Sequence, residues 1–116
     1  MERYSRSSLE LLQMLTTPQL VTKQATSGVS NTIIGALAGD ALTDADQNVA
    51  VGYAALTSDT KGSRSVAIGR EALATQNFTS ATTAYNTAVG ANAGQLIETG
   101  IQNTLIGGLA GDALTV

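Results

Sequence analysis

One short pattern recurs five times along the chain: a polar residue, a short run that ends on valine or isoleucine, and then glycine. The five copies are Asn31–Gly35, Asn48–Gly52, Ser65–Gly69, Asn86–Gly90 and Asn103–Gly107. Successive glycines are separated by 17, 17, 21 and 17 residues. A period this regular predicts a solenoid of stacked coils, because each repeat can bury its apolar face only against its neighbours.

The residues of each copy predict a short strand with apolar side chains on both faces. The residue before the glycine is always valine or isoleucine, the residue before that is also apolar, and alanine lies three places after the glycine. One face of such a strand lies toward the coil interior, so the other needs a neighbouring chain. We therefore expect the following residues to form the repeat core and the packing between chains: Ile34, Val51, Ile68, Val89, Ile106, Gly35, Gly52, Gly69, Gly90 and Gly107.

The composition supports association between chains. Apolar residues make up 43% of the 116 residues, but many are alanine, and the aromatics are three tyrosines and one phenylalanine. Alanine removes less apolar surface from water than larger side chains do, so a single chain gains little from its own core. The Asn or Ser that opens each copy is expected to stack on its equivalents and form a hydrogen-bonded ladder.

Residues 1–28 differ in kind from the repeats and are expected to form an N-terminal docking arm, with the repeat domain over 29–116. Ser7 and Glu10 have the spacing of a capping box, which predicts a short helix that ends before Pro18, followed by extended chain. A helix this short is marginally stable alone, so it needs a surface to dock against. The expected contacts with a partner are Arg3, Arg6, Leu9, Leu12 and Leu15.

The spacing of 21 residues between Gly69 and Gly90 adds four residues to one coil, within 74–85. This segment contains two of the four aromatic residues, Phe78 and Tyr85. Insertions in solenoids commonly form loops on one face, and that face often binds a partner. Two interpretations stay open: a bulge that packs against a neighbouring subunit, or a surface loop that binds a ligand.

The residue types present exclude several kinds of chemistry. The chain has no histidine and no cysteine, so Ser-His-Asp and Cys-His catalysis and the common zinc sites are excluded. Asp44, Asp46 and Asn48 resemble the start of a calcium loop, but Val49 stands where that loop needs glycine, so we interpret them as a solvated turn. The net charge is −3 and no basic stripe is present. We expect no enzyme activity, no cofactor, no metal, no nucleic acid and no membrane as partner.

The unit Asn/Ser-x-Ala-Val/Ile-Gly-x-x-Ala, seen most clearly in Ser65–Ala72, resembles the head repeat of trimeric autotransporter adhesins. Asn86–Gly94 is similar to repeats of bacteriophage fibre and other virion proteins. The resemblance covers about residues 31–116. It implies a left-handed parallel β-roll of about five coils in a homotrimer, with valine and isoleucine packed inward, and it assigns no catalytic residue.

The resemblance leads to a hypothesis for the role of the chain. No signal peptide, coiled-coil stalk or membrane barrel is recognised, so we expect a place on a virion rather than on a cell surface. The first hypothesis is a phage structural protein: a trimeric decoration or cement protein on the capsid exterior, assembled in the host cytoplasm, whose arm docks on the major capsid protein. The alternative is a tail-fibre or adhesin-type segment that binds a receptor on the host surface.

Overall fold

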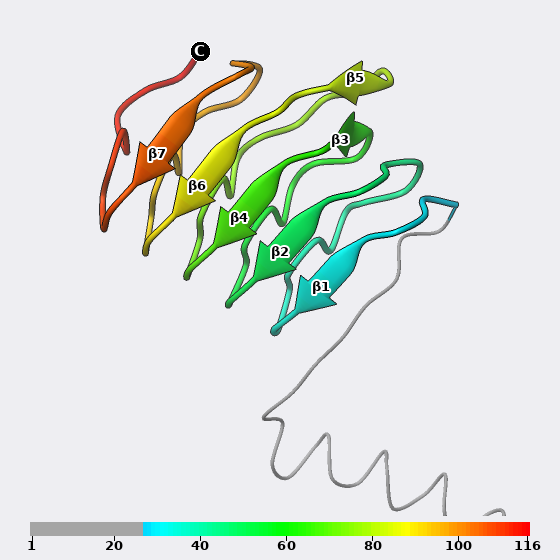
Figure 1. Ribbon diagram of the computed structural model, residues 1–116, viewed down its shortest axis with the longest axis horizontal. Coiled ribbons are helices and arrows are strands. Elements are labelled where there is room, and N and C mark those ends of the chain that lie inside the picture. Colours follow the sequence, from blue (N-terminus) through cyan, green and yellow to red (C-terminus); the bar gives the residue numbers. More distant parts are fainter. Residues whose placement is uncertain (1–26) are drawn as a thin grey trace, which may run out of the picture.

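The computed structural model describes residues 27–116, which form a parallel β-solenoid of about four turns with no helix among them (Figure 1). The all-β solenoid expected from the repeats is thereby confirmed. Five strands pair side by side in one parallel sheet, and two shorter strands pair in a second. The sheet strands are β1 (Thr32–Ile34), β2 (Val49–Val51), β4 (Val66–Ile68), β6 (Thr87–Val89) and β7 (Thr104–Ile106); the short pair is β3 (Gly62–Ser63) and β5 (Thr82–Thr83).

The number of coils differs slightly from the expected value of about five. Each of the five repeat copies supplies one strand, but five strands are joined by only four circuits of chain, which gives about four turns. Within the five-stranded sheet, neighbouring strands pair through equivalent residues of successive coils. The middle residue of each strand therefore lies in one column: Ile33, Ala50, Ala67, Ala88 and Leu105.

The interior of the solenoid is a narrow column of small and branched side chains. The middle strand residues share one buried cluster with the alanines that follow each glycine, such as Ala55 and Ala72. Because three of the five middle residues are alanine, the interior has room for large side chains from the rest of the coil. These are Leu42, Leu56, Leu73 and Ile97, each at most 2% exposed.

The repeat glycines lie at the corner where each strand ends. Gly35, Gly52, Gly69 and Gly90 have φ angles of 122–135°, which only glycine adopts readily. A Cβ atom on any of them would lie 2.5–2.8 Å from a backbone atom of the next glycine in the stack. Glycine is thus required twice at each corner, by the backbone angle and by the close approach of the next coil.

The predicted N-terminal helix and the expected arm contacts Arg3, Arg6, Leu9, Leu12 and Leu15 lie outside the described residues.

Candidate interaction surface

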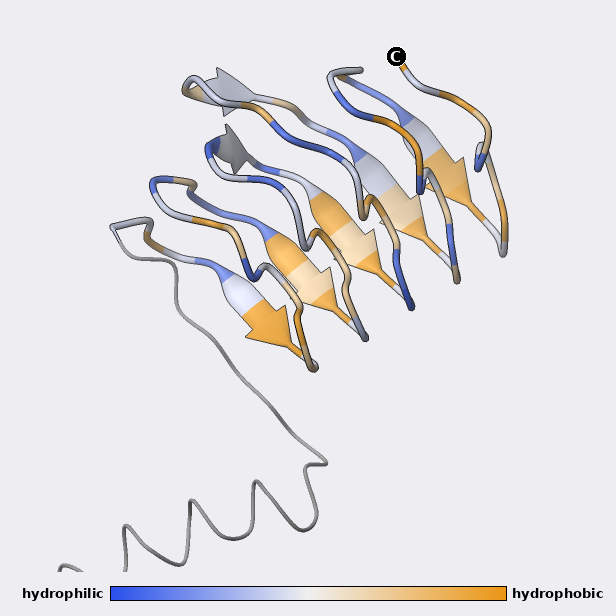
Figure 2. Cartoon of the chain, turned by 180° about the vertical axis from the view of Figure 1, so that it is seen from behind, coloured by the Kyte–Doolittle hydropathy of each residue, from blue (hydrophilic) through white to orange (hydrophobic). Residues whose placement is uncertain are grey.

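The first and third residues of each sheet strand point away from the coil interior and form what we call the outer sheet face. No residue of this face is fully buried in the single chain, and Ile68 and Ile106 are 37% and 65% exposed. Hydrophobic colouring is concentrated along these strands (Figure 2). The face consists of two columns: Thr32, Val49, Val66, Thr87 and Thr104, and Ile34, Val51, Ile68, Val89 and Ile106.

The valines and isoleucines assigned from the sequence to core and chain packing therefore all lie on the outer sheet face. Their neighbours in the strand, such as Ala50 and Ala67, fill the coil interior instead. Alternation along a strand explains this placement, because adjacent side chains point to opposite faces. The structure thus leaves seven β-branched apolar side chains per chain on one regular surface: Ile34, Val49, Val51, Val66, Ile68, Val89 and Ile106.

Beside the sheet, the predicted asparagine ladder is present. The Oδ1 atom of Asn31 accepts a hydrogen bond from the backbone N–H of Asn48 at 2.9 Å, and Asn48 Oδ1 accepts from the N–H of Ser65 at 2.8 Å. Asn86 Oδ1 accepts from the N–H of Asn103 at 2.9 Å. Each of these side chains links one coil to the next, so the ladder fixes the vertical register of the stack.

Ser65 interrupts the ladder, and Gln76 replaces the missing amide. The Gln76 Nε2 atom donates to Ser65 Oγ at 3.1 Å and to Asp59 Oδ2 at 2.6 Å, while its Oε1 accepts from Asn86 Nδ2 at 2.8 Å. All four residues are fully buried. Sequence reasoning missed Gln76 and Asp59, although a signal existed: the one repeat without asparagine is also the one with the longer spacing.

The additional four residues occupy the segment that contains β5. Phe78 pairs with Lys61, and Thr82 pairs with Gly62, so three of the additional residues lie between Phe78 and Thr82. Phe78 is only 7% exposed and lies over Gly62, so the prediction that it belongs to a surface loop is wrong for this side chain. The Phe78 ring, at the start of the additional residues, packs beneath them, because burying its apolar area is favourable.

Tyr85, the other aromatic residue of the segment, is 50% exposed. Arg64 lies over its ring, 5.7 Å from the centroid, and donates to the Tyr85 hydroxyl at 2.8 Å. Arg64 also donates to Gln47 Oε1 at 2.9 Å. The three side chains come from consecutive coils and brace one edge of the solenoid, while part of the tyrosine ring faces solvent.

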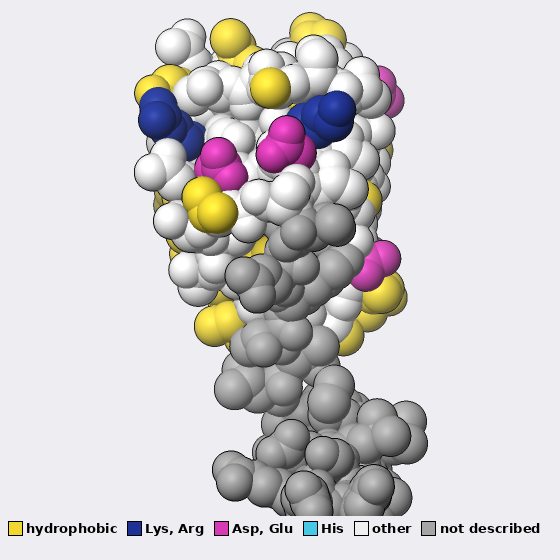
Figure 3. Space-filling model, turned by 90° about the vertical axis from the view of Figure 1, so that its right-hand side faces the viewer, with side chains coloured by type: hydrophobic (Ala, Val, Ile, Leu, Met, Phe, Trp, Pro, Cys, Tyr) yellow, Lys and Arg dark blue, Asp and Glu magenta, His cyan; other side chains and the backbone are white. Residues whose placement is uncertain are grey.

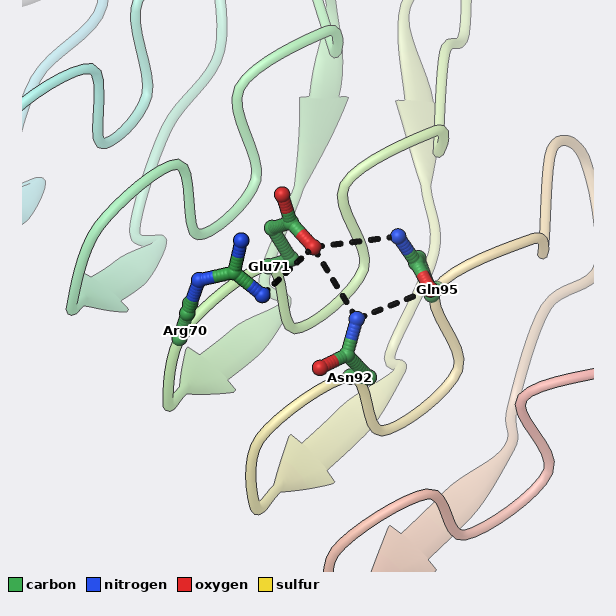
Figure 4. Close-up of polar contacts among 4 residues, drawn as sticks. All are labelled: Arg70, Glu71, Asn92 and Gln95. Carbon is green, nitrogen blue, oxygen red and sulfur yellow. Dashed lines mark hydrogen bonds and ion pairs between the residues drawn. The ribbon is translucent and has the colours of Figure 1, made fainter.

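A second set of polar side chains joins the corners after β4 and β6 (Figure 4). The Oε2 atom of Glu71 accepts from Arg70 Nη1, Asn92 Nδ2 and Gln95 Nε2 at 3.0–3.1 Å. Asn92 Nδ2 also donates to Gln95 Oε1 at 2.9 Å. Three hydrogen bonds converge on one oxygen of the Glu71 carboxylate and join side chains of two successive coils, so the cluster braces these coils.

The acidic residues of the turn before β2 are also used in contacts between coils. Asp46 Oδ1 accepts from the N–H of Val29 at 2.8 Å, and Asp44 Oδ1 accepts from Ser27 Oγ at 3.4 Å. Across residues 27–116, no group of three or more acidic, histidine or cysteine side chains is placed to hold a metal ion. On the face shown in Figure 3, acidic and basic side chains are interspersed and form no patch of a single charge.

No family model, curated protein or solved structure matches the chain. Within the described part of the chain, no helix has the length and apolar character that crossing a membrane requires.

Proposed function

We propose that the chain is a structural protein of a bacteriophage particle: a left-handed, homotrimeric β-roll that decorates the capsid exterior and docks through residues 1–28 on the major capsid protein. The outer sheet face is the observation that carries the proposal. Seven β-branched apolar side chains on a regular surface favour burial against other chains. The trimer, the handedness and the virion come from the resemblance of the repeats to adhesin heads and phage proteins.

The size of the apolar face is sufficient to drive association. Complete burial of a valine or isoleucine side chain contributes about 1.5–3 kcal/mol, and these side chains are already partly covered, so each would add on the order of 1 kcal/mol. Seven such side chains per chain outweigh the loss of translational and rotational freedom only when they are buried together. A closed threefold arrangement buries the face of every chain and leaves none open.

The interior of the solenoid supports a structural role over a catalytic one. Every buried side-chain nitrogen and oxygen in residues 27–116 has a hydrogen-bond partner, including those of Asp59 and Gln76. A catalytic group must be free to exchange a proton or bond with a substrate, and these groups are committed to holding coils together. The polar residues are therefore interpreted as part of the framework.

Replacing Ile68 by lysine is expected to dissociate the trimer. Ile68 lies at the centre of the outer sheet face, where a charge in the packed state would lose its hydration. We expect the protein concentration at which half of the trimer dissociates to rise at least tenfold. In sedimentation, the smallest species of the wild type should have three times the chain mass of 11.8 kDa, and the smallest species of Ile68→Lys should fall toward a monomer.

The control for this experiment is Leu96→Lys, because Leu96 is 46% exposed and does not lie on the outer sheet face. It should leave the mass unchanged. A wild-type chain that stays a folded monomer at all concentrations, or an Ile68→Lys variant that stays trimeric, contradicts the proposed trimer.

The docking arm is tested by replacing Leu9, Leu12 and Leu15 together by serine. Loss of the apolar contacts should reduce the copies bound per capsid at least tenfold, while the trimer mass stays constant, because these residues lie outside the repeats. Quantitative gel analysis of purified parent particles measures the copy number. Full decoration by the variant would refute the arm. A handful of copies at the tail would favour receptor binding, for which the exposed ring of Tyr85 is a candidate contact.

A further inference from the structure

The end of the solenoid beyond β7 carries the same backbone groups that join all earlier coils, but here they have no partner among residues 27–116. At the first junction, the N–H of Thr32 donates to Asn48 O at 2.8 Å, and Ile34 O accepts from the N–H of Gly52 at 2.8 Å. Equivalent bonds recur at each following junction. In the last coil the corresponding groups are Thr104 N–H, Ile106 O, Gly108 O and Gly111 N–H, and no hydrogen bond within residues 27–116 occupies them.

The apolar interior is also open at this end. Residues 31–43 and 103–115 are identical at 11 of 13 positions, so the two coils can be compared directly. Leu42 is 2% exposed beneath the next coil, whereas its equivalent Leu114 is 45% exposed. The last coil therefore presents apolar surface that an additional coil would bury.

The corner glycine of the last coil retains the geometry that admits another backbone. Gly107 has a φ angle of 125°, like the four glycines before it. A Cβ on Gly107 would lie no closer than 4.0 Å to any neighbouring atom, in contrast to the 2.5–2.8 Å found at the other four corners. The ladder residue Asn103 likewise has an Oδ1 atom with no bond from a following coil in the described chain.

The first coil supplies the complementary groups. Asn48, Gly52 and Ala54 donate their backbone N–H groups to the coil before them. The equivalent N–H groups of Asn31, Gly35 and Leu37 make no hydrogen bond within residues 27–116. Because the end coils are nearly identical, stacking one on the other places threonine on threonine and glycine on glycine, as in-register stacks prefer.

We propose that the exposed face of the last coil, 103–115, binds the first coil, 31–43, of a second copy of the chain and continues the sheet from head to tail. The contact runs along the stacking direction, whereas the proposed trimer uses the outer sheet face. The two associations are therefore independent, and a trimer can also stack end to end. The expected bonds join Asn31 N to Asn103 Oδ1, Gly35 N to Ile106 O, Leu37 N to Gly108 O, Thr104 N to Asn31 O, and Gly111 N to Ala38 O.

Alanine at Gly107 tests the proposal, with alanine at the adjacent Gly108 as the control. In a stacked pair, the Cβ of Gly107→Ala would meet the incoming backbone at about the 2.5–2.8 Å found at the four internal corners. Two earlier coils have alanine at the position equivalent to Gly108, Ala36 and Ala91, so a Cβ at this position is compatible with stacking. Gly107→Ala should therefore lower the end-to-end association constant at least tenfold, and Gly108→Ala less than twofold.

The measurement is sedimentation velocity of the 116-residue chain across a concentration series, with electron microscopy of the same samples. The wild type and Gly108→Ala should form particles whose mass rises with concentration in whole multiples of the smallest species. A wild-type mass that does not change with concentration overturns the proposal. It would mean that the end coils are covered by another segment of the same chain or stay uncovered. Equal association of wild type and Gly107→Ala also overturns it.

Thr104→Pro provides a second variant if Gly107→Ala does not keep the circular dichroism spectrum of the wild type. Proline removes the Thr104 N–H, a donor that no group in residues 27–116 uses, and so blocks the edge without removing an internal bond. It should lower end-to-end association at least tenfold, and Thr104→Ala should not. Unchanged stacking in Thr104→Pro overturns the proposal.

Discussion

Replacing Gly69 by alanine is expected to lower the free energy of unfolding by about 3–5 kcal/mol. Two costs combine at this position. The φ angle of 129° strains any residue with a Cβ. The added Cβ would also lie 2.5 Å from Gly90 O and 2.6 Å from Gly90 C, and neither backbone atom can move without separating the coils. The midpoint of urea unfolding, at fixed protein concentration because association contributes, measures the loss.

Gly107→Ala separates the two costs. Gly107 has nearly the same φ angle, 125°, but a Cβ added there would lie no closer than 4.0 Å to a neighbouring atom. We expect this variant to lose only the backbone term, about 1–3 kcal/mol, at concentrations too low for end-to-end contact. The difference between the variants then measures the steric cost of one coil junction. If both variants lose the same free energy, close approach of the coils is not what requires the internal glycines.

Much of the fold was predictable from the sequence because every sequence repeat folds into a coil of the same backbone geometry. The nearly constant spacing of the glycines predicted coils, and the polar residue before each strand predicted a ladder, which the bonds of Asn31 and Asn48 confirm. Each prediction follows from in-register stacking, in which equivalent residues of neighbouring coils are placed next to one another.

The sequence was less informative about which side chains point inward. All three strand positions are apolar in Val49–Val51, so alternation gives no direct signal. The signal lies in size: alanine recurs at the middle position, because a coil of 17 residues encloses a narrow interior, while valine and isoleucine occupy the outer sheet face. The repeat that lacks asparagine and has the longer spacing signalled that another side chain completes the ladder. The sequence did not show that this side chain is Gln76, because its position depends on where the additional residues of the coil fold.

Replacing Asp59 by asparagine is expected to lower the free energy of unfolding by about 3 kcal/mol, because it leaves a buried donor unpaired. The carboxylate accepts bonds from the N–H groups of Phe78 and Gly62 and from Gln76 Nε2, at 2.6–3.1 Å. An amide at this position would direct its Nδ2 at another donor. Rotation of the Gln76 amide would satisfy the new group, but Asn86 Nδ2 would then lose one of its two acceptors, Gln76 Oε1, and keep only Gly100 O.

A compensating variant tests whether bond direction is the cause. In Asp59→Asn combined with Gln76→Glu, the new carboxylate accepts from both Asn86 Nδ2 and the introduced amide, while the amide oxygen still accepts from the backbone of Phe78 and Gly62. The total charge is unchanged. We expect the double variant to recover at least half of the stability lost by Asp59→Asn, whereas the exposed control Asp112→Asn should change it by less than about 0.5 kcal/mol. A double variant as unstable as the sum of its two single variants would show that the direction of these bonds does not hold the long coil together.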